Sequence, residues 1–248
     1  MGDTRAFMNY RTGAVTYARI QSLSGTTVTL ESAYTGAPAD TWVYNMDVHN
    51  TMAVVRKSRI VGGRRYGLCF RVVRGLVADN ECIENSGPAI NLTNDAVWAS
   101  HEGLFGQHVK ILRNTFQGQN FDAAAWRERE GVVEVAVQAY DGSHGVEALS
   151  RSLQDVSVCD NTFVDWQIAG VRLLNTSGGL VSGNVFRNTI GLFSTTPNFM
   201  IDIGQCEDIA GTDNQDADSR NVTQNLRVQE SDRVSVTFQE GGAFGFQA

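Results

Sequence analysis

The chain has 248 residues, of which 42% are hydrophobic and 19% are charged, so it can bury a core and is not a disordered sequence. Its net charge of −7 disfavours a nucleic-acid-binding surface, because phosphate recognition needs clustered lysine and arginine. The chain contains no run of 18 apolar residues, so no segment is predicted to span a membrane.

The N-terminal region alternates apolar and polar residues with a period of two. Residues 13–20 and 26–30 both show this alternation, and Ser24-Gly25 lies between them. Two alternating runs joined by a short turn are typical of a β-hairpin. The sequence therefore predicts that residues 1–45 form a small antiparallel β appendage at the first coil of the region that follows, where it covers an otherwise open end.

A short phrase recurs from residue 55 onward: a β-branched or Leu-containing run, then Asn or Ser, then an apolar residue two places later. The clear copies are residues 77–82, 111–116, 158–163 and 181–186, and residues 55–60 are a weaker one. The Asn or Ser positions lie 22, 34, 47 and 23 residues apart. The spacing indicates a unit of about 22–24 residues, since 47 is close to two units and 34 is one unit with an insertion.

A repeat of this length favours stacked coils. Short strands in each coil pair with the coils above and below at about 4.8 Å, and the apolar residue after each Asn stacks on its counterparts. Asn tolerates the left-handed backbone of a tight corner, and its amide can bond along the stack. The segments 89–92, 170–174 and 191–193 fit as second strands, and 233–238 as the last strand.

These patterns predict an all-β fold, a right-handed parallel β-helix of about eight coils over residues 46–248. A β-sandwich is the alternative, but it does not explain the recurring Asn-x-Phe phrase. Insertions at 94–107, 119–131 and 140–152 break the rhythm of the repeat. Insertions on a repetitive scaffold are where function is expected.

The first insertion contains Asp95, Trp98, His101 and Glu102 within eight residues. Sugar recognition needs this mixture, because an aromatic ring packs on the C–H face of a pyranose while carboxylates bind its hydroxyl groups. A surface loop with one packed Trp is the simpler alternative.

The second insertion adds Asp122 and Trp126, and the third, residues 140–147, either closes the same groove or is a plain Asp-Gly turn. Glycoside hydrolysis needs two carboxyl groups, which lie about 6.5–9.5 Å apart in inverting enzymes. Loops on neighbouring coils can meet that spacing, so Asp95 is paired with Asp122 or Glu102, and Glu134 is a further candidate.

No cofactor or metal is predicted. The four cysteines lack CxxC spacing, which disfavours zinc and favours buried thiols. The carboxylates of residues 207–218 resemble a Ca²⁺ loop in density but lack the Gly and Glu of an EF-hand, so a solvated acidic loop is the preferred interpretation.

Four phrases together resemble the bacterial α-1,3-galactosidases that remove the terminal galactose of blood-group-B-type glycans. They lie within residues 10–30, 43–47, 87–102 and 109–116, and the third is the most specific. The resemblance implies a parallel β-helix enzyme that hydrolyses a terminal α-galactoside with inversion and without a metal. It carries Asp95 over as catalytic, and Trp98 and Glu102 as part of the substrate pocket. The chain departs from the family after Phe116, where no acid occurs before Asp122.

The sequence thus predicts an inverting glycoside hydrolase that acts on an oligosaccharide or polysaccharide outside the cell or in the periplasm, although no signal peptide is visible. The predicted catalytic residues are Asp95, Asp122 and Glu102, and the predicted substrate-binding residues are Trp98, His101, Trp126 and Glu134. A non-catalytic glycan-binding β-helix is one alternative. A polysaccharide lyase is the other, but the loops around Asp95 lack the clustered basic residues expected for an acidic polymer. The oligomeric state stays open.

Overall fold

The computed structural model describes residues 4–36, 38–46, 52–97, 100–102, 104–121, 131–140, 145–148, 150–189, 198–218, 220 and 222–239. The protein is all-β with large parallel sheets, and a single 3₁₀ turn, η1 (Pro38–Asp40), interrupts the strands of the described residues. None of the helical structure in this part of the chain is long and apolar enough to cross a bilayer.

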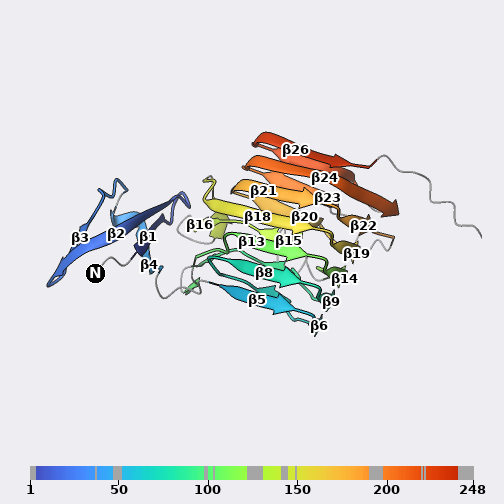
Figure 1. The fold of residues 1–248 in the computed structure, drawn as a ribbon, viewed down its shortest axis with the longest axis horizontal. Coiled ribbons are helices and arrows are strands. Elements are labelled where there is room, and N and C mark those ends of the chain that lie inside the picture. The colour runs from blue at the N-terminus through green and yellow to red at the C-terminus, as the bar shows by residue number, and fades with distance from the viewer. Residues whose placement is uncertain are drawn as a thin grey trace, which may run out of the picture.

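The N-terminal strands form a four-stranded antiparallel sheet in the order β3-β2-β1-β4 (Figure 1). Their bounds are β1 (Thr4–Asn9), β2 (Val15–Ser24), β3 (Thr27–Leu30) and β4 (Thr41–Asn45). As the alternation predicts, β2 and β3 are joined by a two-residue turn, in which Gly25 has a φ of 57°. Ala6 and Met8 of β1 are fully buried, so one face of this sheet packs against the rest of the protein.

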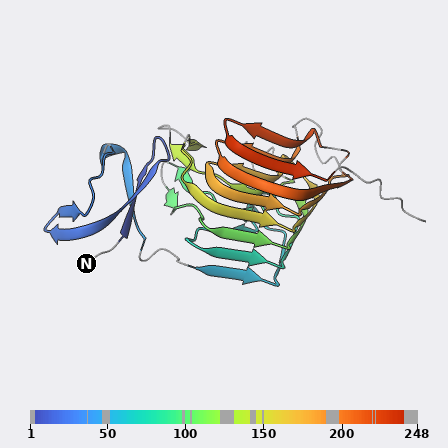
Figure 2. The ribbon, with the colours of Figure 1, turned by 45° about the horizontal axis from the view of Figure 1, so that its top comes forward.

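Apart from two short antiparallel hairpins, the remaining strands form three parallel ladders, which the chain visits in turn (Figure 2). The first ladder contains β5 (Ala53–Arg56), β8 (Gly75–Ala78), β13 (Val109–Leu112), β18 (Leu153–Cys159), β21 (Thr176–Ser182), β24 (Glu207–Asp218) and β26 (Asp232–Phe238). The second contains β6 (Arg59–Val61), β9 (Glu81–Ile83), β14 (Thr115–Gln119), β19 (Thr162–Trp166) and β22 (Val185–Arg187). The third contains β7 (Leu68–Cys69), β10 (Ile90–Asn91), β15 (Gly131–Val135), β20 (Ala169–Leu174), β23 (Phe199–Gly204) and β25 (Gln224–Gln229).

We call three successive strands, one from each ladder, a rung; β5, β6 and β7 make the first. The long strand β24 pairs with β21 through its first half and with β22 through its second half. Through β24 the first and second ladders belong to one 12-stranded sheet. The third ladder is a separate six-stranded sheet, and the predicted insertions at 94–107 and 140–152 follow its strands. The insertion at 119–131 instead follows β14 of the second ladder and precedes β15.

A row of buried asparagines marks the corner between the first and second ladders. Its members are Asn80, Asn114, Asn161, Asn184 and Asn214. Each Oδ1 accepts the backbone N–H and the side-chain amide of the asparagine one rung below, as in the bonds of 2.9 and 3.0 Å from Asn114 to Asn161. The row starts at Ser58, whose backbone N–H donates to Asn80. The amide ladder predicted for the repeat is therefore confirmed.

The prediction was wrong about which residue turns the corner. The left-handed residue is the one immediately before each Ser or Asn, not the Asn itself. These residues are Lys57, Asp79, Arg113, Asp160, Gly183 and Asp213, with φ values of 52°, 58°, 53°, 57°, 66° and 60°. The physical reason is that the buried Asn side chain must point into the corner to reach its neighbours, so the residue before it adopts the left-handed backbone.

The apolar residue two places after each Asn stacks in the core, as the repeat predicts. Phe116 and Phe163 have ring centroids 5.0 Å apart, and Phe163 and Phe186 are 4.9 Å apart. All three are fully buried, and Cys82 occupies the equivalent position one rung earlier. One continuous core therefore runs along the ladders.

Candidate functional site

Two short hairpins leave the carboxyl-terminal edge of the third ladder in consecutive rungs. The first, β11 (Asp95–Val97) with β12 (Ser100–Glu102), follows β10. The second, β16 (Gln138–Tyr140) with β17 (Gly145–Glu147), follows β15. Strand β11 contacts both β16 and β17, so the two hairpins lie side by side.

The first hairpin brings three predicted site residues together. The antiparallel register places Asp95 opposite Glu102 and Ala96 opposite His101. Trp98, Asp122 and Trp126 lie outside the described residues. The pairing of Asp95 with Asp122 therefore stays a prediction, whereas Asp95 and Glu102 are cross-strand neighbours.

Asn94 ties the bases of the two hairpins together. Its Nδ2 donates to the Gln138 carbonyl at 3.0 Å, and its Oδ1 accepts the Gln138 backbone N–H at 2.8 Å. The side chain is 1% exposed, so these bonds lie in a low-dielectric environment where they are strong. Asn94 thus fixes the backbone next to Asp95 against the neighbouring rung.

The N-terminal sheet packs beside the same hairpins. The side chain of Ser152 donates to the Gly13 carbonyl at 3.0 Å, and a Cβ at Gly13 would lie 2.4 Å from that of Ala148. Gly13 also has a φ of 73°, so both its backbone and its surroundings require glycine. Gln107 donates to the Tyr17 hydroxyl. These contacts reach the segments between the second and fourth rungs, and Figure 1 shows β16 on the side of the ladders that faces the N-terminal sheet.

Glu134 lies on the third ladder and is 3% exposed. Its Oε1 accepts from Arg172 Nη1 at 2.8 Å, and its Oε2 accepts the Gly131 backbone N–H at 2.7 Å. The carboxylate is therefore held in an ion pair beneath the surface of the ladder.

Glu134 belongs to a row of charged residues that the sequence analysis missed. The next three strands continue the row in register with Arg172, Asp202 and Arg227. Each member lies 25 to 38 residues after the one before it in the sequence. Arg227 binds Asp202 through two bonds of 2.5 and 2.7 Å, and its guanidinium lies over the Phe199 ring. The available signal was a single charged residue inside each apolar strand, as in Asp202 between Ile201 and Ile203.

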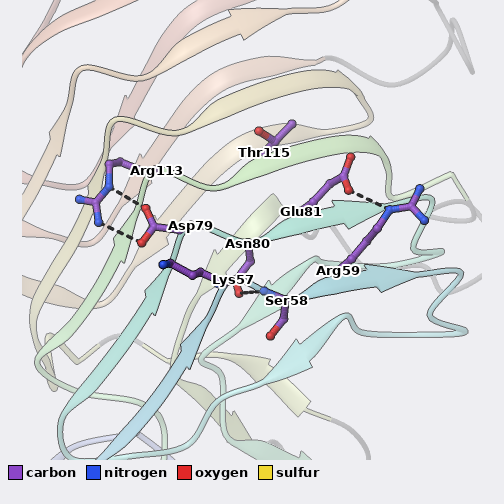
Figure 3. A pocket seen from close by; sticks show the side chains of 8 residues that line it. All are labelled: Lys57, Ser58, Arg59, Asp79, Asn80, Glu81, Arg113 and Thr115. Atoms are coloured by element: carbon purple, nitrogen blue, oxygen red, sulfur yellow. Dashed lines mark hydrogen bonds and ion pairs between the residues drawn. The ribbon is translucent and has the colours of Figure 1, made fainter.

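A hollow of about 500 Å³ lies at the corner of the first rungs (Figure 3). Most of the charged groups at this corner pair with one another: Arg113 and Arg56 bind Asp79, and Arg59 binds Glu81. Lys57 also lines the hollow. The Arg113 and Arg56 guanidinium groups lower the pKa of Asp79. Solvent-accessible pairs of this kind contribute little energy, and we interpret the hollow as a solvated charged surface.

The acidic residues of 207–218 belong to strand β24, not to a loop, so the loop interpretation was wrong. Glu207 and Asp208 pair with Arg233, and Asp218 pairs with Arg220. In the part of the chain that the structure describes, no three His, Cys, Asp or Glu side chains are grouped to hold a metal ion. All four cysteines are free thiols.

No family model matches the chain, and no curated protein matches it. The paired hairpins and the charged row are therefore the structural features from which we infer a function.

Proposed function

We propose that the rungs form a right-handed parallel β-helix and that the protein is an inverting glycoside hydrolase that acts on terminal α-galactosides of glycans outside the cell or in the periplasm. The observation that carries the proposal is the pair of hairpins at one edge of the third ladder, with Asp95 and Glu102 opposite each other on the first. The resemblance of residues 87–102 to α-1,3-galactosidases supports the same substrate.

The chemistry needs one carboxylic acid to protonate the leaving oxygen and one carboxylate to activate water. An inverting enzyme places these groups about 6.5–9.5 Å apart. Cross-strand residues have Cβ atoms about 4.5–5.5 Å apart, so inversion requires the longer Glu102 side chain to hold its carboxyl group away from that of Asp95. Asp95 is the proposed catalytic residue, with Glu102 or Asp122 as its partner.

Precise placement of the acid is as necessary as its presence, because small displacements of catalytic groups cost large factors in rate. The buried Asn94 bonds supply that placement, since they fix the residue before Asp95 to the next rung. Asn94 is therefore a positioning residue, and Trp98, His101 and Trp126 are proposed to contact the sugar.

The test is hydrolysis of nitrophenyl α-galactoside and of galactose-terminated oligosaccharides by the wild type and by Asp95→Asn and Glu102→Gln. General acid–base catalysis contributes about 10²–10⁴-fold, so we expect Asp95→Asn to lose at least about 100-fold in kcat. Asp160→Asn is the matched control, because Asp160 is an exposed carboxylate with a left-handed backbone that Asn also adopts. NMR of the first product anomer tests inversion.

Two results would contradict the proposal. If the wild type and Asp95→Asn bind galactose-terminated glycans equally and neither hydrolyses them, the protein is a glycan-binding module. If incubation with uronate polymers gives unsaturated products, it is a polysaccharide lyase.

A further inference from the structure

A pocket of about 280 Å³ opens at the carboxyl-terminal ends of β20, β23 and β25. Its principal lining residues are Arg172, Leu174, Asp202, Gly204, Gln205 and Arg227, with Gln229 and Glu230 at the rim. These residues occupy the same edge of the third ladder as the two hairpins, in the rungs that follow them. The pocket is thus a continuation of the candidate site along the stack.

The floor of the pocket is built from buried charges. Arg172 is 6% exposed and Asp202 is 1% exposed. Asp202 accepts two bonds from Arg227 and lies 3.5 Å from Arg172 Nε, while Arg172 also binds Glu134. Burying charges is costly unless each is paired, so this row holds its polar atoms in a fixed arrangement.

The walls of the pocket keep its space open. In the register of β20, β23 and β25, Gly204 lies between Leu174 and Gln229. A Cβ at Gly204 would lie 2.7 Å from Leu174 Cδ2, so any larger residue would occupy the pocket. At the rim, Gln205 Nε2 donates to Glu230 at 3.3 Å.

The lining chemistry selects the ligand. Two cations, Arg172 and Arg227, face two carboxylates, Asp202 and Glu230, so the lining carries no net charge to attract an anion. Fixed donors and acceptors together with a small apolar surface suit hydroxyl groups, each of which both donates and accepts. A volume near the lower end of the range for ligand pockets suits a single small unit.

We propose that this pocket is a subsite for one uncharged sugar unit of an oligosaccharide whose terminal unit lies at the paired hairpins. The proposal rests on the proposed function. The pocket lies two to four rungs beyond β10, the strand before Asp95, and at about 4.8 Å a rung this is about 10–20 Å. Only a chain of several sugars reaches both places, so the pocket confers a preference for longer substrates.

The test compares α-1,3-galactose-terminated di-, tri-, tetra- and pentasaccharides. Their binding is measured by titration calorimetry on the Asp95→Asn protein, and their hydrolysis is measured on the protein with Asp95 intact. Gly204→Val fills the pocket without removing a charge, and Arg227→Met removes the guanidinium. Ala210→Val is the matched control, because Ala210 is exposed on β24 of the first ladder. Thermal unfolding of each variant checks the fold.

We expect the longer oligosaccharides to bind about tenfold more tightly than the disaccharide, as two or three hydrogen bonds would give. Gly204→Val and Arg227→Met should abolish that difference, and Ala210→Val should retain it. The inference is overturned if affinity does not depend on length, if no oligosaccharide binds, or if the filled pocket retains the difference. Length-dependent binding without hydrolysis would support the subsite and contradict only the proposed hydrolase activity. Hydrolysis without length dependence would support the hydrolase activity and contradict the subsite.

Discussion

Removing one member of the asparagine row should destabilise the protein strongly. Asn161 is fully buried, and its Oδ1 accepts the Asn114 backbone N–H at 2.9 Å and the Asn114 amide at 3.0 Å. Its Nδ2 donates to the Ile111 carbonyl at 2.9 Å and to Asn184 at 3.1 Å. Asn161→Ala therefore removes four bonds and leaves buried groups in two rungs without their partner.

The expected magnitude follows from these four bonds. A buried polar group left without its partner costs about 1–3 kcal/mol, and bonds in a row are coupled, so we expect a loss of about 4 kcal/mol in the free energy of unfolding. Asn161→Asp should be at least as harmful, since its carboxylate replaces a donor and would face the Ile111 and Asn184 oxygens.

The assay is urea denaturation followed by circular dichroism, with the exposed Asn225→Ala on β25 as the matched control. Hydrogen exchange at the backbone N–H of Asn114 reports its bond to Asn161 Oδ1 locally, because protection of that N–H depends on the bond. The control should change the free energy of unfolding by less than about 1 kcal/mol. If Asn161→Ala also changed it by less than that, the row would not stabilise the corner as we infer.

Three further predictions follow from the core and the site. Phe163→Ala removes the middle ring of the stack and should cost about 3–5 kcal/mol of unfolding free energy by urea titration, whereas Phe163→Leu should cost less. Asn94→Ala should lower kcat more than it raises KM, and Asn94→Gln should not restore the rate, because the clamp depends on side-chain length. Burial raises the pKa of the Cys82 thiol to about 12, so the native state keeps the thiol protonated at pH values where the unfolded state ionises, near pH 9 and above. The free energy of unfolding should therefore fall between about pH 9 and 12. Cys82→Ala should reduce that fall, as measured by urea titrations at several pH values.

The asparagine row could be predicted from the sequence because every rung needs a side-chain amide at the same position to bond the rungs on either side. Its last member could not. Asn214 continues the ladder of amides, but the residue two places later is Asp216, which pairs with Phe186 in register. The phrase that identified the other copies is therefore broken where β24 reaches the end of the stack.

The charged row could not be predicted, because the two residues of each ion pair are neighbours in the fold but lie far apart in the sequence. Arg172 meets Glu134 across 38 residues, and Arg227 meets Asp202 across 25. The irregular intervals come from the insertions, whose lengths the repeat does not determine. The hairpin that joins Asp95 to Glu102 was likewise treated as an undivided loop, since its two strands of three residues are too short for alternation to reveal.

The corner of the first rungs and the third ladder differ in how they hold charge, and this difference bears on the proposed subsite. At the corner that follows the first ladder, the carboxylate of Asp79 is 26% exposed and lies between Arg56 and Arg113, where screening makes the pairs weak and replaceable. On the third ladder, the side chains of Glu134, Arg172 and Asp202 are 4%, 7% and 2% exposed. A well-packed apolar row would stabilise such a position at least as well as buried ion pairs do. Stability alone therefore does not explain charges at these positions, whereas the proposed subsite does, because a polar floor of fixed donors and acceptors is what hydroxyl groups require.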